Sequence, residues 1–181
     1  MFRYNVKPEA SMDLKSYIRE IPDFPKQGIV FKDITPLLQN PRSFCYAVDA
    51  IADFLGSKRT DAILSIEARG FFFGAALAYR LQKPLVPIRK GGKLPSSTMS
   101  VTYALEYGTD TLEIHKDGIL PGQEVVIVDD VLATGGTVGA ACRLVDEMGA
   151  RVSGLAFLIE LGFLDGRKTL SNYDIYSLIT Y

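Results

Sequence analysis

The chain has 181 residues, of which 48% are hydrophobic and 23% charged, a composition typical of one soluble globular domain. Its formal net charge of −1 gives no strong overall field for nucleic acid or an anionic membrane, so an anionic ligand must be held by local groups. No apolar run is long enough to span a bilayer, and the one histidine and two cysteines lack metal-ligand spacing. We therefore expect one cytoplasmic domain over residues 1–181 that binds neither nucleic acid nor membrane.

Two helices are predicted in the first third of the chain. In Met12–Ile21 the apolar residues Leu14 and Ile18 recur at helical spacing. The segment Asn40–Gly56 has an N-capping residue, a proline in its first turn and a glycine stop, with apolar side chains facing inward at Phe44, Val48, Ile51 and Leu55.

Strands and helices then alternate. Strands are predicted at Ala62–Ile66, Pro84–Arg89, Val125–Asp130 and Val152–Glu160, and helices at Gly70–Leu81 and Thr137–Gly149. Continuous apolar strands joined by helices indicate an α/β fold, with a central, mostly parallel twisted sheet flanked by helices.

The segment 90–108 interrupts this alternation. Lys90–Ser100 is rich in glycine, serine and proline, and the stretches Val101–Gly108 and Thr111–His115 resemble an antiparallel pair. A long irregular segment inside a compact α/β domain is often functional, so we expect a flexible antiparallel lid loop.

Two adjacent carboxylates, Asp129 and Asp130, end the apolar run Val125–Val128, and a glycine-rich turn into a helix follows them. Such a turn presents backbone N–H groups to a phosphate. It lacks the lysine of a P-loop and the glycine spacing of a dinucleotide fingerprint. Carboxylates beside a phosphate site suit vicinal sugar hydroxyls, which donate hydrogen bonds to them. The pattern therefore predicts a ribose that bears a 5-phosphate.

The same stretch, Val125–Thr137, resembles the phosphoribosyl pyrophosphate motif of the type I phosphoribosyltransferases. Further motifs resemble the adenine-using members of that family, in the same order: Asp23–Leu38, Glu67–Gly74, Arg89–Pro95, Leu105–His115 and Ile159–Arg167. The resemblance runs from about Asp13 to Tyr181. One departure is Lys32, where many members have arginine.

The resemblance implies an activity and a cofactor. The family members transfer the 5-phosphoribosyl group from phosphoribosyl pyrophosphate to adenine, and the products are AMP and pyrophosphate. Mg²⁺ is expected to arrive on the pyrophosphate rather than in a protein cage. The resemblance also implies a small N-terminal adenine hood within residues 1–36 and a homodimer.

The resemblance assigns residues to each part of the substrates. It assigns the ribose 5-phosphate to Asp129, Asp130, Ala133, Thr134, Gly135, Gly136 and Thr137, pyrophosphate to Glu67, Ala68, Arg69, Arg89, Lys90 and Lys93, and adenine to Val30, Phe31 and Lys32. It makes Glu106, Arg69 and Lys93 the catalytic candidates, with Glu106 as an acid or base near purine N7. In the family, the Glu67–Ala68 peptide is typically cis.

Other interpretations stay open at this point. Without the resemblance, Phe31 reads as a core residue, Lys93 as a solvated loop residue and Glu106 as a surface strand residue. A regulator that keeps the pocket and binds nucleic acid is a second class of protein, although the chain carries neither an added module nor a basic surplus. A third interpretation changes the base to hypoxanthine, guanine, xanthine or orotate.

Overall fold

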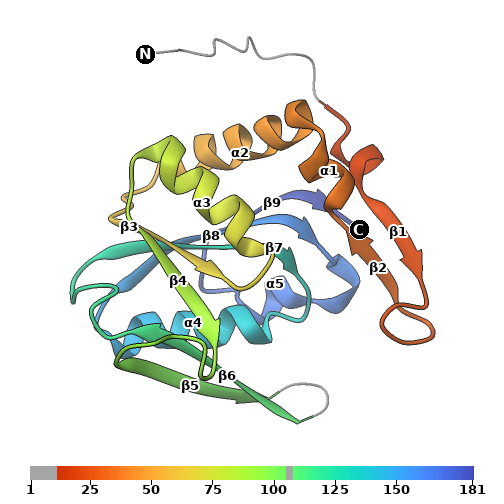
Figure 1. Ribbon diagram of the computed structural model, residues 1–181. Helices are drawn as coiled ribbons and strands as arrows, with labels where there is room; N and C mark the ends of the chain where they lie inside the picture. The colour runs from red at the N-terminus through yellow and green to blue at the C-terminus, as the bar shows by residue number, and fades with distance from the viewer. Residues whose placement is uncertain (1–11, 105–107) are drawn as a thin grey trace. The chain divides into compact units, whose positions relative to one another are not determined.

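The computed structural model describes residues 12–104 and 108–181. The chain divides into two compact units, Met1–Ala47 and Val48–Tyr181. Each unit is described by itself below, and Figure 1 shows the elements of both.

The smaller unit is built on a two-stranded sheet. A 3-10 turn, η1 (Leu14–Tyr17), leads into β1 (Arg19–Pro22), which pairs antiparallel with β2 (Val30–Asp33). The helix predicted over Met12–Ile21 is therefore wrong. Leu14 and Ile18 are buried as expected, but a 3-10 turn followed by a strand satisfies the same spacing.

Two helices follow β2. The short α1 (Thr35–Gln39) belongs to the smaller unit, and α2 (Pro41–Gly56) crosses the boundary between the units. The predicted cap is confirmed, because Asn40 Oδ1 accepts hydrogen bonds from the backbone N–H groups of Arg42 and Ser43. Of the residues predicted to face inward, Val48, Ile51 and Leu55 are buried, and Phe44 is half-buried.

The larger unit contains a seven-stranded sheet in the order β5-β6-β4-β3-β7-β8-β9. Its strands are β3 (Ala62–Ile66), β4 (Leu85–Lys90), β5 (Thr98–Ala104), β6 (Thr109–His115), β7 (Glu124–Leu132), β8 (Arg151–Glu160) and β9 (Ile175–Thr180). Five strands run parallel to one another: β3, β4, β7, β8 and β9. β6 is antiparallel to both of its neighbours, β4 and β5. The expected mostly parallel sheet and the antiparallel pair are both confirmed, and the pair extends the edge of the main sheet.

Helices cover both faces of this sheet. α3 (Gly70–Leu81) packs on β3 and β7, and α4 (Gly136–Glu147) packs on the opposite face (Figure 1). A 3-10 turn, η2 (Gly162–Leu164), and the short α5 (Gly166–Thr169) connect β8 to β9. The flanked sheet is the doubly covered arrangement that the apolar strands predict.

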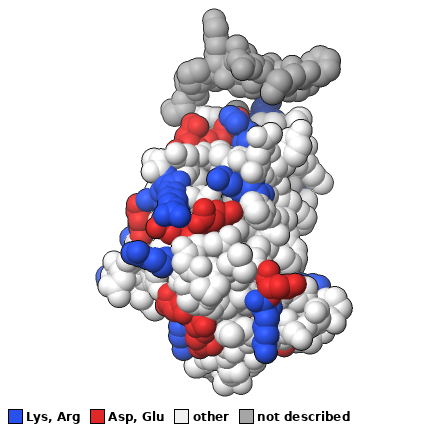
Figure 2. Space-filling view, turned by 90° about the vertical axis from the view of Figure 1, so that its left-hand side faces the viewer, with Lys and Arg blue, Asp and Glu red and all other residues white. Residues whose placement is uncertain are grey.

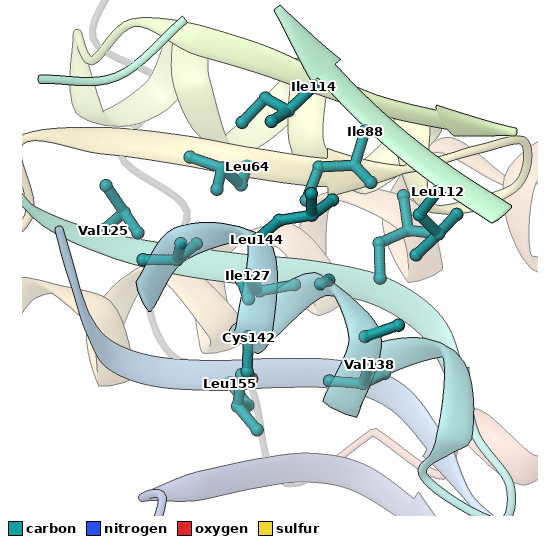
Figure 3. Close-up of a cluster of buried hydrophobic side chains, with 14 of the residues drawn as sticks. Leu64, Ile88, Leu112, Ile114, Val125, Ile127, Val138, Cys142, Leu144 and Leu155 are labelled. Carbon is teal, nitrogen blue, oxygen red and sulfur yellow. The ribbon is translucent and has the colours of Figure 1, made fainter. Parts of the chain in front are cut away.

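The main core fills the space between α4 and the sheet. Figure 3 shows Val138, Cys142 and Leu144 of α4 facing Leu64, Ile127 and other buried side chains of the strands. Because burial of apolar surface is the main favourable term in folding, this core fixes the sheet from which the site residues extend.

Two global features bear on the class of protein. Across residues 12–104 and 108–181, no helix has both the length and the apolar character needed to cross a membrane. On the face shown in Figure 2, acidic and basic side chains lie in mixed clusters.

Candidate active site

A pocket of about 400 Å³ lies at the carboxyl ends of β3 and β7. The chain leaves β3 for β4 on one side, whereas β7 lies on the other side, so this is the switch point where ligands bind in open α/β sheets. The pocket is lined by Ile66, Glu67, Ala68, Arg69, Lys90, Tyr103, Asp110, Leu112, Asp129, Asp130, Val131, Ala133 and Thr137. Its size suits a small-molecule ligand.

The predicted acidic pair lines this pocket. Asp130 is 5% exposed, and its Oδ2 lies 2.8 Å from Arg69 Nε in an ion pair that lacks hydrogen-bond geometry. Asp129 Oδ1 accepts a hydrogen bond from the Asp130 N–H at 2.8 Å. The buried Oδ2 of Asp130 therefore retains acceptor capacity for a ligand hydroxyl.

The environment of the pair disfavours its negative charge. Burial, and then the charge of Asp130, raises the pKa of the Asp129 carboxyl well above its ordinary value. Burial also raises the pKa of Asp130, although the Arg69 guanidinium opposes that rise. A ligand that donates hydrogen bonds or carries positive charge relieves this cost, so the pair suits a sugar whose ring becomes cationic.

The close approach of Asp129 explains on steric grounds why position 70 is a glycine. A Cβ atom added at Gly70 would lie 2.8 Å from Asp129 Oδ1 and 3.1 Å from Asp129 Cα. The start of α3 thus approaches the end of β7 more closely than a side chain allows. This contact places Arg69 beside Asp130.

The predicted phosphate loop, Ala133–Thr137, joins β7 to α4. Gly135 caps α4 with φ of 86°, in the left-handed region that favours glycine. Ala133 and Thr137 line the pocket, while Thr134, Gly135 and Gly136 complete the turn between them. The first N–H groups of a helix have no partner within it, so the start of α4 offers donors to an anion.

The predicted pyrophosphate residues divide into two groups. Glu67, Ala68, Arg69 and Lys90 line the pocket, and the Glu67–Ala68 peptide is cis as the resemblance implies. Arg89 does not line it: its Nε donates to Glu67 Oε2 at 2.6 Å, and its guanidinium also donates to the carbonyl of Lys93. Lys93 has an exposed side chain outside the pocket lining.

Two polar residues of the pocket, Tyr103 and Asp110, are absent from the sequence-based prediction. They are cross-strand partners in the β5–β6 pair. Lys90 Nζ lies 3.0 Å from an Asp110 carboxylate oxygen; the hydrogen bond and charge of Asp110 raise the pKa of Lys90, and Lys90 lowers the pKa of Asp110. The Thr137 hydroxyl donates to the Tyr103 hydroxyl at 3.3 Å. Only the register of the antiparallel pair could have revealed both.

The predicted adenine residues lie on β2 of the smaller unit. The Phe31 ring meets the Phe24 ring edge-on, with centroids 5.2 Å apart. Lys32 forms an ion pair with Glu20, and Val30 is 45% exposed. The catalytic candidate Glu106 lies outside the described residues.

The fold and the site together define a phosphoribosyltransferase. The chain belongs to this family, since residues 34–177 match the model of the phosphoribosyl transferase domain. The mostly parallel seven-stranded sheet flanked by helices is the type I phosphoribosyltransferase fold.

The similar proteins belong to one group within this family, the adenine phosphoribosyltransferases. An adenine phosphoribosyltransferase of Thermoanaerobacter pseudethanolicus is 58% identical over 169 residues, which are 93% of this chain and 98% of the relative. The crystal structure of that organism's enzyme superimposes with a TM-score of 0.90, also at 58% identity and with 93% and 98% of the two chains covered. An adenine phosphoribosyltransferase of Saccharomyces cerevisiae, in complex with an imino-altritol bisphosphate and adenine, is 41% identical, with a TM-score of 0.86 and 91% and 96% covered.

Proposed function

We propose that this chain transfers the 5-phosphoribosyl group from phosphoribosyl pyrophosphate to adenine, with AMP and pyrophosphate as products. One observation carries the proposal: the carboxylate pair, of which Asp130 is buried, and the predicted phosphate loop share one pocket at the end of β7. Relatives at 58% identity over nearly their whole length carry the name of this activity.

In this proposal the acidic and the basic residues of the pocket bind different parts of the substrate. Asp129 and Asp130 accept hydrogen bonds from the ribose hydroxyls, and their negative charge stabilises the cation that develops on the sugar. The loop Ala133–Thr137 holds the 5-phosphate with N–H donors at the start of α4. Arg69 and Lys90 also line the pocket, and their positive charges neutralise the departing pyrophosphate.

Mg²⁺ fits the chemistry of this pocket. The ion prefers oxygen ligands and is usually held by one or two carboxylates together with substrate phosphates. Asp129 and Asp130 line the pocket with carboxylate oxygens, and Asp130 Oδ2 accepts no hydrogen bond from the described residues, so the pair suits an ion that arrives on the pyrophosphate. When bound, Mg²⁺ offsets the charge of the pyrophosphate.

The base is assigned to the smaller unit. In this proposal Phe31 stacks on adenine, and main-chain groups of Val30 and Lys32 pair with its amino group and ring nitrogen N1. The Lys32 side chain is engaged by Glu20, which agrees with a main-chain role. Glu106 stays the candidate acid or base near purine N7.

A homodimer in the cytoplasm completes the proposal. Support for self-association comes from the exposed apolar side chains of Phe72 and Tyr79 on α3 and of Leu85 on β4, which are 50%, 88% and 42% exposed. Support for a reducing compartment comes from the free thiols of Cys45 and Cys142. Sedimentation equilibrium tests the dimer directly, since a monomer mass at micromolar concentration contradicts it.

The activity is tested with a panel of bases. Adenine, hypoxanthine, guanine, xanthine and orotate are each incubated with phosphoribosyl pyrophosphate and Mg²⁺, and the nucleotide formed is measured. Hypoxanthine reverses the donor and acceptor at the read edge, which costs about 1–3 kcal/mol for each unpaired buried group. We expect a large preference for adenine, and the same preference in Lys32→Ala. Equal kcat/KM for adenine and hypoxanthine contradicts the assignment.

A further inference from the structure

The motif Ile159–Arg167 has no role in the site described so far, yet part of it touches the phosphate loop. A Cβ atom added at the buried Gly166 would overlap the carbonyl oxygen of Ala133, and one added at Gly135 would lie 3.0 Å from the carbonyl oxygen of Gly166. Backbone therefore packs directly on backbone between the α5 turn and the loop. Any side chain at position 166 must move one of them.

The residue after this glycine holds the α5 turn against the sheet. Arg167 donates from Nε to Glu160 Oε1 at 2.9 Å and from a terminal nitrogen to Glu160 Oε2 at 2.6 Å. Its other terminal nitrogen donates to the carbonyl of Ile175 at 3.1 Å. The Ser177 hydroxyl donates to Glu160 Oε2 at 2.8 Å. A bidentate pair of this kind fixes direction as well as distance.

The anchor of this network lies level with the start of the phosphate loop. Glu160 is the β8 partner of Leu132, the last residue of β7 before Ala133. The N–H of Leu161 donates to the Leu132 carbonyl at 2.9 Å. Glu160 is 7% exposed, so its two oxygens hold their geometry away from solvent. The end of β7 is thus tied to the same residue that orients Arg167.

The geometry points to Glu160, Gly166, Arg167 and Ser177 as a brace that positions the phosphate loop for the 5-phosphate. These are positioning residues, because they reach the ligand only through Ala133 and Gly135. The inference rests on the proposed function, since it assigns the brace to the 5-phosphate part of the substrate. The inference predicts that damage to the brace weakens the binding of phosphoribosyl pyrophosphate but not that of adenine or free pyrophosphate.

The test compares two brace variants with matched controls. Gly166→Ala pushes on Ala133, and Arg167→Gln removes the bidentate pair. Gly56→Ala is the control for the first, because an added Cβ there meets nothing within 4 Å. Arg80→Gln is the control for the second, because it breaks the more exposed pair with Asp49, at 3.0 Å. Steady-state kinetics give both KM values, and calorimetry gives the binding of phosphoribosyl pyrophosphate and of free pyrophosphate.

We expect the KM for phosphoribosyl pyrophosphate to rise about tenfold to a hundredfold in both brace variants, because a small misplacement of a binding loop has effects of this size. The KM for adenine and the affinity for free pyrophosphate should stay at the wild-type values, as should every value in the controls. A brace that serves stability alone lowers Tm and leaves both KM values unchanged. That result, or a parallel rise of both KM values, overturns the inference.

The inference can still be tested if a variant does not fold or if the wild-type chain is inactive. If Arg167→Gln does not fold, Gly166→Ala and the milder Ser177→Ala decide by the same criteria. If the wild-type chain forms no AMP, the proposed function fails, but calorimetry still tests the brace through phosphoribosyl pyrophosphate against pyrophosphate. If the wild type forms AMP and the brace variants bind phosphoribosyl pyrophosphate normally, the inference about the brace is wrong and the proposed function stands.

Discussion

At the scale of single residues, the negative charge of the carboxylate pair serves ligand binding but lowers the stability of the fold. Burial raises the pKa of Asp129 and of Asp130. A carboxyl whose folded pKa is raised stabilises the fold fully below its ordinary pKa, and this contribution is lost as pH rises through the raised value. The ionised form of the pair therefore carries a cost in the protein without a ligand, which a ribose with its hydroxyl donors offsets.

The variant Asp129→Asn separates the two effects. We expect a Tm a few degrees higher than that of the wild type at pH 8, since about 1 kcal/mol corresponds to about 2–4 °C in a chain of this size. The gap should shrink as pH falls through the raised pKa of the folded wild-type carboxyl, and it should be closed below the ordinary value of about 4. Turnover should fall about tenfold to a hundredfold with loss of a charge-assisted hydrogen bond. Thermal melts across pH give the first result and initial rates the second; a gap that widens in acid contradicts the pKa argument.

Tyr103 gives a second prediction at this scale. Its hydroxyl accepts from Thr137 in the phosphate loop, and the residue is 6% exposed. Tyr103→Phe removes the hydrogen bond from Thr137, worth about 0.5–1.5 kcal/mol, and the hydrogen bond between the Tyr103 hydroxyl and Asp110. We expect the KM for phosphoribosyl pyrophosphate to rise about twofold to tenfold. The control is Tyr173→Phe, which lies beside Cys142 rather than in the pocket; equal kinetics for wild type and Tyr103→Phe would show that the hydroxyl is dispensable.

At the scale of elements, the contact of α3 with β3 is unusually close. A Cβ atom added at Gly74 would overlap Ser65, which is fully buried. Alanine favours a helix over glycine by about 1 kcal/mol, but overpacking costs about 1–3 kcal/mol and displaces the helix. We expect Gly74→Ala to lower the free energy of unfolding, as measured with urea. Adding Ser65→Gly should restore part of the loss, whereas additive effects of the two changes would contradict a direct clash.

The segment between β4 and β5 is the second element with a prediction. Gly92 has φ of 74°, its N–H donates to Glu113 Oε2 at 3.0 Å, and the neighbouring residues are mostly exposed. Such a segment suits a lid that closes over the pyrophosphate. We expect phosphoribosyl pyrophosphate to slow proteolysis of the peptide bonds in 90–100, with adenine alone as the control. Identical cleavage patterns with and without the substrate would count against a lid.

At the scale of the whole molecule, the features that depend on local sequence patterns were predicted, whereas most of those that depend on long-range contacts were not. β3 and α3 were predicted with the observed bounds, because continuous apolar strands and helical spacing are local signals. The helix over Met12–Ile21 was wrong because pairing with β2 overrides the spacing of Leu14 and Ile18.

The site shows the same division. Asp129 and Asp130 were predicted from neighbouring residues alone, and the structure places both in the pocket. Tyr103 and Asp110 depend on the β5–β6 register, and the contact of Gly166 with Ala133 depends on the path of the chain after β8. No local pattern encodes such contacts. The cis Glu67–Ala68 peptide was expected through the resemblance only.

The strand order also governs when the site can exist during synthesis. Of the seven strands of the larger sheet, β3 leaves the ribosome first, followed by the turn at Glu67–Arg69. Its neighbour in the sheet, β7, follows only after β4, β5 and β6. The residues that orient the phosphate loop, Glu160 to Ser177, emerge later still. A nascent chain therefore holds its cations without the carboxylates that face them, and the nucleotide pocket forms only when the chain is almost fully translated.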